Sequence, residues 1–142
     1  AWVAQKARIP GYYPPQVAAK ALAIGAQIVA TAGRAYRAGL KIAFGTDGGV
    51  YPHGENAGEF VLMNQAGIPA MASLQAATIR AAQLLRHDTE LGSLTPGKLA
   101  DVVAVTGDPL QDIGLMQHMN FVMKQGTVYL RDGQPTSQAP AQ

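Results

Sequence analysis

A short apolar run that ends in an acidic residue constrains the fold of this chain more than any other feature. The run is residues 41–47, Lys-Ile-Ala-Phe-Gly-Thr-Asp, and glycines stand on either side at positions 39 and 48. Such a run between glycine-rich breaks is typical of a parallel strand that is covered on both faces. A parallel strand needs neighbouring strands and helical connections, so the pattern predicts an α/β fold.

Helical periodicity surrounds this predicted strand. Residues 16–38 carry apolar side chains at spacings of three and four, and Gly39 is well placed to end the helix. Further helices are predicted over 55–66 and over 70–86, with Pro69 opening the latter. Residues 1–15 are interpreted as a loop, because Pro-Gly and Pro-Pro pairs interrupt them.

The character of the chain changes after Asp88. Residues 99–106 contain a β-branched centre, and residues 121–124 and 127–130 flank Gln-Gly, which is typical of a tight hairpin turn. About three strands are the least that stand alone. We therefore expect this small β part to complete a sheet begun elsewhere. Residues 134–142 are predicted to form a flexible tail because of their Gln, Pro, Ser and Ala content.

Composition excludes several classes of protein. The net charge is +2 with scattered Lys and Arg, which does not favour nucleic-acid binding. No apolar run approaches the ~20 residues that a membrane helix needs. The absence of cysteine removes disulfides, thiolate metal sites and cysteine nucleophiles, but leaves the compartment open between cytoplasm and periplasm.

The strongest candidate for chemistry is Asp47, at the predicted carboxyl end of the strand. Barrel enzymes place catalytic side chains at this position, where a carboxylate can bind a divalent metal and accept a proton. The alternative is an aspartate that caps a turn or a helix. The local pattern leaves both interpretations open.

Other polar residues nearby are ambiguous. His53 could bind substrate or carry a proton, and Tyr51 lies on the same predicted loop. Glu55 and Glu59 are spaced one helical turn apart, so they could form an acidic pair, although carboxylates in a first helical turn more often complement the helix dipole. His87 and His118 have no ligand spacing and are interpreted as structural or solvent-facing.

Motifs of other enzyme classes are missing from the sequence. It contains no Gly-x-Ser-x-Gly elbow, no His-Glu-x-x-His helix and no phosphate-binding Gly-x-x-x-x-Gly-Lys-Ser/Thr loop. The glycines after the predicted strand also lack the spacing of a dinucleotide-binding loop.

Several segments resemble the amidohydrolase superfamily, in its imidazolonepropionase-like and Xaa-Pro-dipeptidase-like branch. Residues 42–47 followed by Pro52-His53-Gly54-Glu55-Asn56 resemble the last barrel strand and its loop. Ala76-Ala77-Thr78 with Ala81-Ala82 resembles the next helix. The return into a small β domain is matched by Leu91 to Val103, Gly107-Asp108-Pro109-Leu110 and Val122 to Gly126. The resemblance covers residues 40–133.

The resemblance implies a fold and a domain division. It implies the C-terminal segment of a (β/α)8 TIM-type barrel followed by strands of a small composite β-sandwich. Residues 1–95 would hold the last β/α units, residues 96–133 the strands of the small β domain, and residues 134–142 the flexible tail. It also implies one or two divalent metals, usually zinc, that lower the pKa of a bound water.

The same resemblance implies roles for individual residues. Asp47 would contact the metal or its water and act as general base in cleaving an amide of a peptide or N-acyl amino acid. Tyr51 and His53 would border the substrate. Family enzymes take further ligands from a His-x-His pair and from middle strands that this sequence lacks, and one ligand is too few for a site. We therefore expect the missing N-terminal part of the same enzyme as a partner, with the chain alone inactive.

Two alternatives stay open. One is a cyclic-amide hydrolase or deaminase of the same superfamily, and the other is a non-catalytic assembly module without its metal half. The remaining expectations are a small-molecule amide or dipeptide substrate, a homo-oligomer, and neither a nucleic-acid nor a membrane partner.

Overall fold

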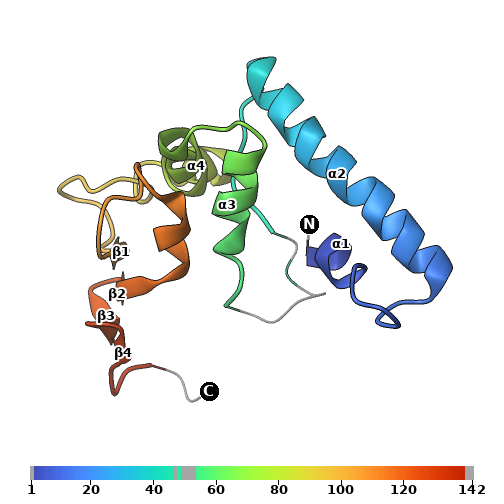
Figure 1. Ribbon diagram of the computed structural model, residues 1–142. Helices are drawn as coiled ribbons and strands as arrows, with labels where there is room; N and C mark the ends of the chain where they lie inside the picture. Colours follow the sequence, from blue (N-terminus) through green and yellow to red (C-terminus); the bar gives the residue numbers. More distant parts are fainter. Residues whose placement is uncertain (1, 47, 49–53, 140–142) are drawn as a thin grey trace.

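The computed structural model describes residues 2–46, 48 and 54–139, and it places a layer of helices beside a small sheet (Figure 1). The helices are α1 Trp2–Lys6, α2 Pro15–Arg37, α3 Gly58–Gln65, α4 Ala70–Ala77, α5 Ile79–Leu85 and the 3-10 helix η1 Ile113–Gln117. The strands are β1 Val102–Val105, β2 Met119–Lys124, β3 Thr127–Arg131 and β4 Gln134–Pro135. A mixed α/β composition is therefore confirmed.

The long helix α2 confirms the predicted helix over 16–38, with Pro15 at its first position. The prediction of a loop over 1–15 is wrong for Trp2–Lys6, which form α1. Here α1 packs closely on α2, since a Cβ at Gly25 would lie 2.5 Å from the Ala4 Cβ. Tertiary packing supports this short helix, and periodicity over five residues cannot reveal such support.

The predicted helix over 70–86 is two helices, because the backbone breaks at Thr78, with φ −121° and ψ −98°. The Thr78 hydroxyl donates to the Leu74 carbonyl at 2.7 Å. A threonine that bonds back to a carbonyl of the preceding turn competes with helical geometry. The helix predicted over 55–66 is shorter and spans Gly58–Gln65 as α3.

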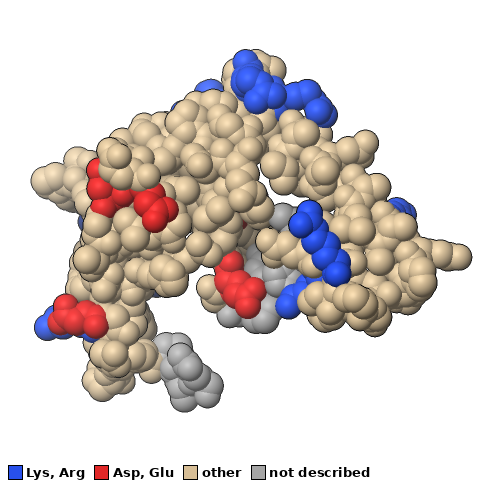
Figure 2. All heavy atoms as spheres, in the orientation of Figure 1, with Lys and Arg blue, Asp and Glu red and all other residues tan. Residues whose placement is uncertain are grey.

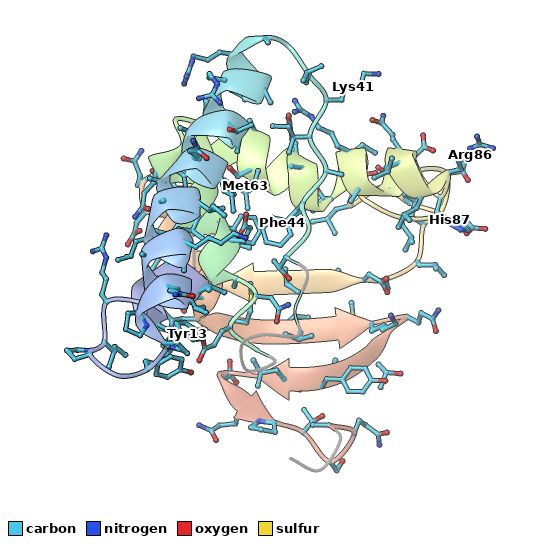
Figure 3. The ribbon with its side chains drawn as sticks, turned by 90° about the vertical axis from the view of Figure 1, so that its right-hand side faces the viewer. Tyr13, Lys41, Phe44, Met63, Arg86 and His87 are labelled. Atoms are coloured by element: carbon cyan, nitrogen blue, oxygen red, sulfur yellow. The ribbon has the colours of Figure 1, made fainter. Side chains whose placement is uncertain are left out.

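Two clusters of buried side chains form the core. One holds Met63, Ala66, Ile68, Ala72 and Ala76, and the other holds Phe60, Ile113 and Met116. Phe44 packs against both clusters, and Figure 3 shows it in the middle of the molecule, where the chain descends from Lys41 between the helices. The core therefore lies where α3, α4 and η1 meet the segment that contains Phe44.

Residues 41–46 do not form the strand that the sequence predicts. The one sheet found in the described part of the chain holds only β1 to β4. The Phe44 N–H instead donates to the Ala76 carbonyl of α4 at 3.0 Å. A parallel strand exists only when neighbours pair with it, and the described residues supply none for this segment.

The sheet is antiparallel throughout, in the order β1-β2-β3-β4. The predicted hairpin at Gln125-Gly126 is confirmed, and both residues have positive φ, 49° and 81°. Two positive φ values are what a type I′ turn requires. Residues 134–135 pair with β3 as β4, in the region predicted to be a flexible tail.

Burial differs between the helical layer and the sheet. Ile68 and Ala76 are almost fully buried, whereas every strand residue is half-buried or exposed. The sheet reaches the core through Val105 and Met119, which pack against the cluster of Phe60 and η1.

The surface of the described chain is mixed in character. On the face drawn in Figure 2, basic and acidic side chains lie in small, separate groups among uncharged residues. Within the described ranges, no helix is long and apolar enough to cross a membrane.

Candidate active site

The three residues singled out by the sequence, Asp47, Tyr51 and His53, lie outside the described residues. Their proposed roles are therefore untested by the structure. What the structure describes is how the chain enters this region at Thr46 and how it continues from Gly54 into α3.

The chain segment that leads to Asp47 is held in place by Phe44. Besides the hydrogen bond from its N–H to Ala76, its ring lies 4.5 Å from that of Phe60, with the planes tilted by 35°. Aromatic pairs at this separation attract beyond the area they bury. Phe44 therefore fixes the chain two residues before Thr46 to both α3 and α4.

The chain segment that continues from Gly54 towards α3 is held in place by Asn56. Its Nδ2–H donates to the Thr46 hydroxyl at 3.0 Å, and its Oδ1 accepts from the Gly54 N–H at 3.2 Å. The backbone carbonyl of Asn56 accepts from the Glu59 N–H at 3.1 Å, in the turn that leads into α3. One side-chain amide thus joins two points that are distant in sequence. In the sequence, Asn56 stands out only as part of the motif of residues 52–56, because nothing in the spacing identifies its partner.

The two carboxylates that are spaced one helical turn apart in the sequence do not lie on one helix. Glu59 lies in the first turn of α3, while Glu55 precedes the helix and is exposed. Glu59 is half-buried, and this burial raises the pKa of its carboxyl above the usual value. Desolvation penalises the charged form of an acid, which is the cause of the shift.

The interpretation of His87 and His118 as structural or solvent-facing is confirmed. His87 is exposed and its Nδ1 lies 3.3 Å from the Glu90 carboxylate three residues on. His118 is exposed at the end of η1. Both therefore belong to local surface structure.

The described residues do not fit a metal site by themselves. Across residues 2–46, 48 and 54–139, no group of three His, Cys, Asp or Glu side chains could hold a metal ion. A site needs at least three protein ligands, so no catalytic step through a metal follows from these residues.

A cleft of about 570 Å³ opens beside the segment that was predicted to be a strand. Leu40, Lys41, Ile42 and Ala43 line one side, and Arg80, Gln83 and Leu84 of α5 line the other. Leu40 and Leu84 are 61% and 72% exposed. This side of the segment is therefore open and partly apolar.

Comparison with known proteins identifies the family. The sequence model of the amidohydrolase family matches residues 4–130, so this chain belongs to the amidohydrolase family. The resemblance noted from the sequence motifs is confirmed.

Two solved structures are similar to this chain. One is a Xaa-Pro dipeptidase with methionine bound in its active site, which is 46% identical with a TM-score of 0.83 over 91% of this chain and 32% of that protein. The other is a putative prolidase from Bifidobacterium longum, which is 31% identical with a TM-score of 0.75 over 90% of this chain and 31% of that protein.

A curated relative carries a different activity in its name. Adenine deaminase 4 of Rhizobium meliloti (strain 1021) is 42% identical over 67 residues, which are 47% of this chain and 10% of the deaminase. The chain thus spans about a third of the similar structures and a tenth of this relative.

Proposed function

We propose that this chain is the C-terminal part of a metal-dependent amidohydrolase that cleaves an amide bond in a dipeptide or N-acyl amino acid. The similarity to the Xaa-Pro dipeptidase, which extends over most of the chain, carries this proposal. The similarity to a putative prolidase supports the same substrate class. Because the chain spans only about a third of these proteins, the activity belongs to the longer enzyme.

In this proposal residues 41–47 form the last strand of a (β/α)8 barrel, and the preceding strands come from the N-terminal part of the enzyme. Two observations support it. The flank of residues 40–43 is an open, partly apolar cleft, and no strand among the described residues pairs with it. Ile24 and Ile28 of α2 are 39% and 55% exposed, although the helical periodicity predicts that they are buried. In the full barrel, further helices and strands would cover both surfaces.

Asp47 is the general base of the proposed reaction. It accepts a proton from the attacking water and returns it to the leaving nitrogen of the cleaved amide. Tyr51 and His53 border the substrate on the loop that follows. A divalent metal, which we propose to be zinc, would supply an acidified water, and most of its ligands would come from outside this chain.

The test is the substitution Asp47→Asn in the full-length protein, assayed with Xaa-Pro dipeptides. We expect kcat to fall by about 10²–10⁴-fold with an unchanged melting temperature, because the base is lost and its shape is kept. Asp88→Asn, at an exposed position after α5, is the matched control and should retain full activity. An Asp47→Asn variant with near-normal kcat would falsify the assignment of the base.

A deaminase is the second candidate, favoured by the curated relatives named adenine deaminase. The two candidates differ in their products, which are free proline from a Xaa-Pro dipeptide and ammonia from adenine. Ammonia release from adenine without dipeptide cleavage would replace the first proposal with the second.

A further inference from the structure

The side chain of Asn56 makes one local and one distant contact. Its contact with the Gly54 N–H closes a turn two residues long, which asparagine often does. Its contact with the Thr46 hydroxyl spans ten residues and is partly buried. In the sequence, Thr46 directly precedes Asp47 and Gly54 directly follows His53. The amide therefore connects the two ends of the segment that carries Asp47, Tyr51 and His53.

Both ends of this connection are attached to the core. Thr46 lies two residues after Phe44, which is fixed by the Phe60 ring and the Ala76 carbonyl. Asn56 lies in the turn that begins α3, whose Phe60 and Met63 are buried. A hydrogen bond between two points that are already fixed loses little entropy, so it can set a geometry closely.

We propose that Asn56 is a positioning residue, which ties Thr46 to Gly54 and so sets the backbone at Thr46, next to Asp47 in the sequence. The proposal rests on the function proposed above, because that function assigns Asp47 its role as base. Asn56 itself touches neither substrate nor reacting atoms in this scheme. Its effect on the reaction comes through the position of the backbone next to Asp47.

The side-chain chemistry of Asn56 explains why a simpler residue would not serve. The amide donates to the hydroxyl and accepts from the N–H at the same time. Alanine removes both contacts, and glutamine carries the same groups one methylene further from the backbone. On the other side, valine at position 46 keeps the shape of threonine but cannot accept a hydrogen bond, whereas serine can.

The experiment compares Asn56→Ala, Thr46→Val and the double variant in the full-length protein. We expect each single variant to lower kcat by about 10–100-fold with little change in KM, because small displacements of reacting groups cost this much. The double variant should lose much less than the product of the two single effects, since both substitutions remove the contact between Asn56 and Thr46. Thr46→Ser should keep most of the wild-type kcat.

A matched control separates positioning from stability. Asn64 lies on α3, and its Nδ2–H donates to the Ile68 carbonyl at 3.4 Å, so it contacts neither Thr46 nor Gly54 through this bond. Asn64→Ala should lower the melting temperature about as much as Asn56→Ala does, yet keep kcat. A kcat for Asn56→Ala that is within twofold of wild type, or one that falls no further than in Asn64→Ala, would overturn the proposal.

A second measurement does not depend on the reaction. Asn56→Ala should speed hydrogen exchange at the Gly54 amide, whereas Thr46→Val should leave that amide protected. Unchanged exchange in Asn56→Ala would overturn the proposal even if the enzyme is inactive on dipeptides. A wild-type protein that cleaves no dipeptide defeats the proposed function, and in that case the exchange result alone decides whether Asn56 holds the Gly54 amide.

Discussion

Residues 42–46 and the strands β1 to β3 are both rich in apolar residues, but only the second group is paired in a sheet. A two-residue turn joins β2 to β3, and β1 pairs with β2 across a connection that contains η1. Residues 42–46 have no strand beside them in the described chain. Their contacts with the rest of the chain include the Phe44 ring, the Phe44 N–H and the Thr46 hydroxyl, which accepts from Asn56.

The difference shows which interactions each region depends on. Antiparallel neighbours joined by tight turns need only local sequence, whereas a parallel strand depends on partners a dozen or more residues away. The sheet consequently forms its ladder while its faces stay half-buried. The 42–46 segment is well packed at Phe44 while its backbone lacks a ladder. Side-chain packing should therefore dominate in one region and backbone geometry in the other.

The largest expected effect is at Phe44. Phe44→Ala removes the ring that contacts both core clusters and should lower the free energy of unfolding by about 3 kcal/mol. Chemical denaturation of the full-length protein measures this change. The matched control is Val103→Ala in β1, whose side chain is 53% exposed and should cost less than about 1 kcal/mol. Equal losses in the two variants would remove the contrast between the regions.

At the hairpin turn, by contrast, stability should depend on backbone geometry and not on side-chain packing. Gly126 has φ 81°, and a Cβ built there meets no atom within 4 Å. Gly126→Ala should therefore cost about 1 kcal/mol through backbone strain alone, without any steric clash. The melting temperature of the variant measures this cost. Gln125→Ala, which replaces one non-glycine residue with another at positive φ, should change it little, and a larger loss there would contradict the argument from backbone geometry.

The same contrast explains which elements of the fold can be predicted from the sequence. The hairpin and the long helix α2 are predicted well, because Gln-Gly at the turn and the 3.6-residue periodicity are local signals. The strand over 41–47 is not found in residues 41–46, because pairing depends on neighbours. The break at Thr78 and the helix α1 also escape prediction, because a side-chain hydrogen bond and packing on Gly25 decide them.

The candidate site was predictable only in part. The position of Asp47 after an apolar run indicates chemistry, and the family match supports the motif in which it stands. Its role stays a prediction, as do those of Tyr51 and His53. The link between Asn56 and Thr46 could not be inferred, because a distance of ten residues in a loop has no periodicity to reveal it.

The smallest expected effect tests charge in the helical layer. The charged residues that end β2 and β3, Lys124 and Arg131, are exposed, whereas Glu59 of α3 is half-buried with a raised pKa caused by desolvation. An acid with a raised pKa in the folded state binds more protons there than when unfolded, so stability falls as the pH rises through that pKa. Glu59→Gln should therefore be slightly more stable than wild type at about pH 7.

This advantage should vanish at low pH, where the wild-type carboxyl is protonated and neutral like the amide. Melting temperatures of both proteins across this range measure the effect, and the exposed Glu55→Gln serves as the control. A carboxylate in the first turn of α3 also gains from the helix dipole. If Glu59→Gln is less stable than wild type at about pH 7, that gain outweighs desolvation, and the helical layer tolerates charge as readily as the exposed ends of the strands do.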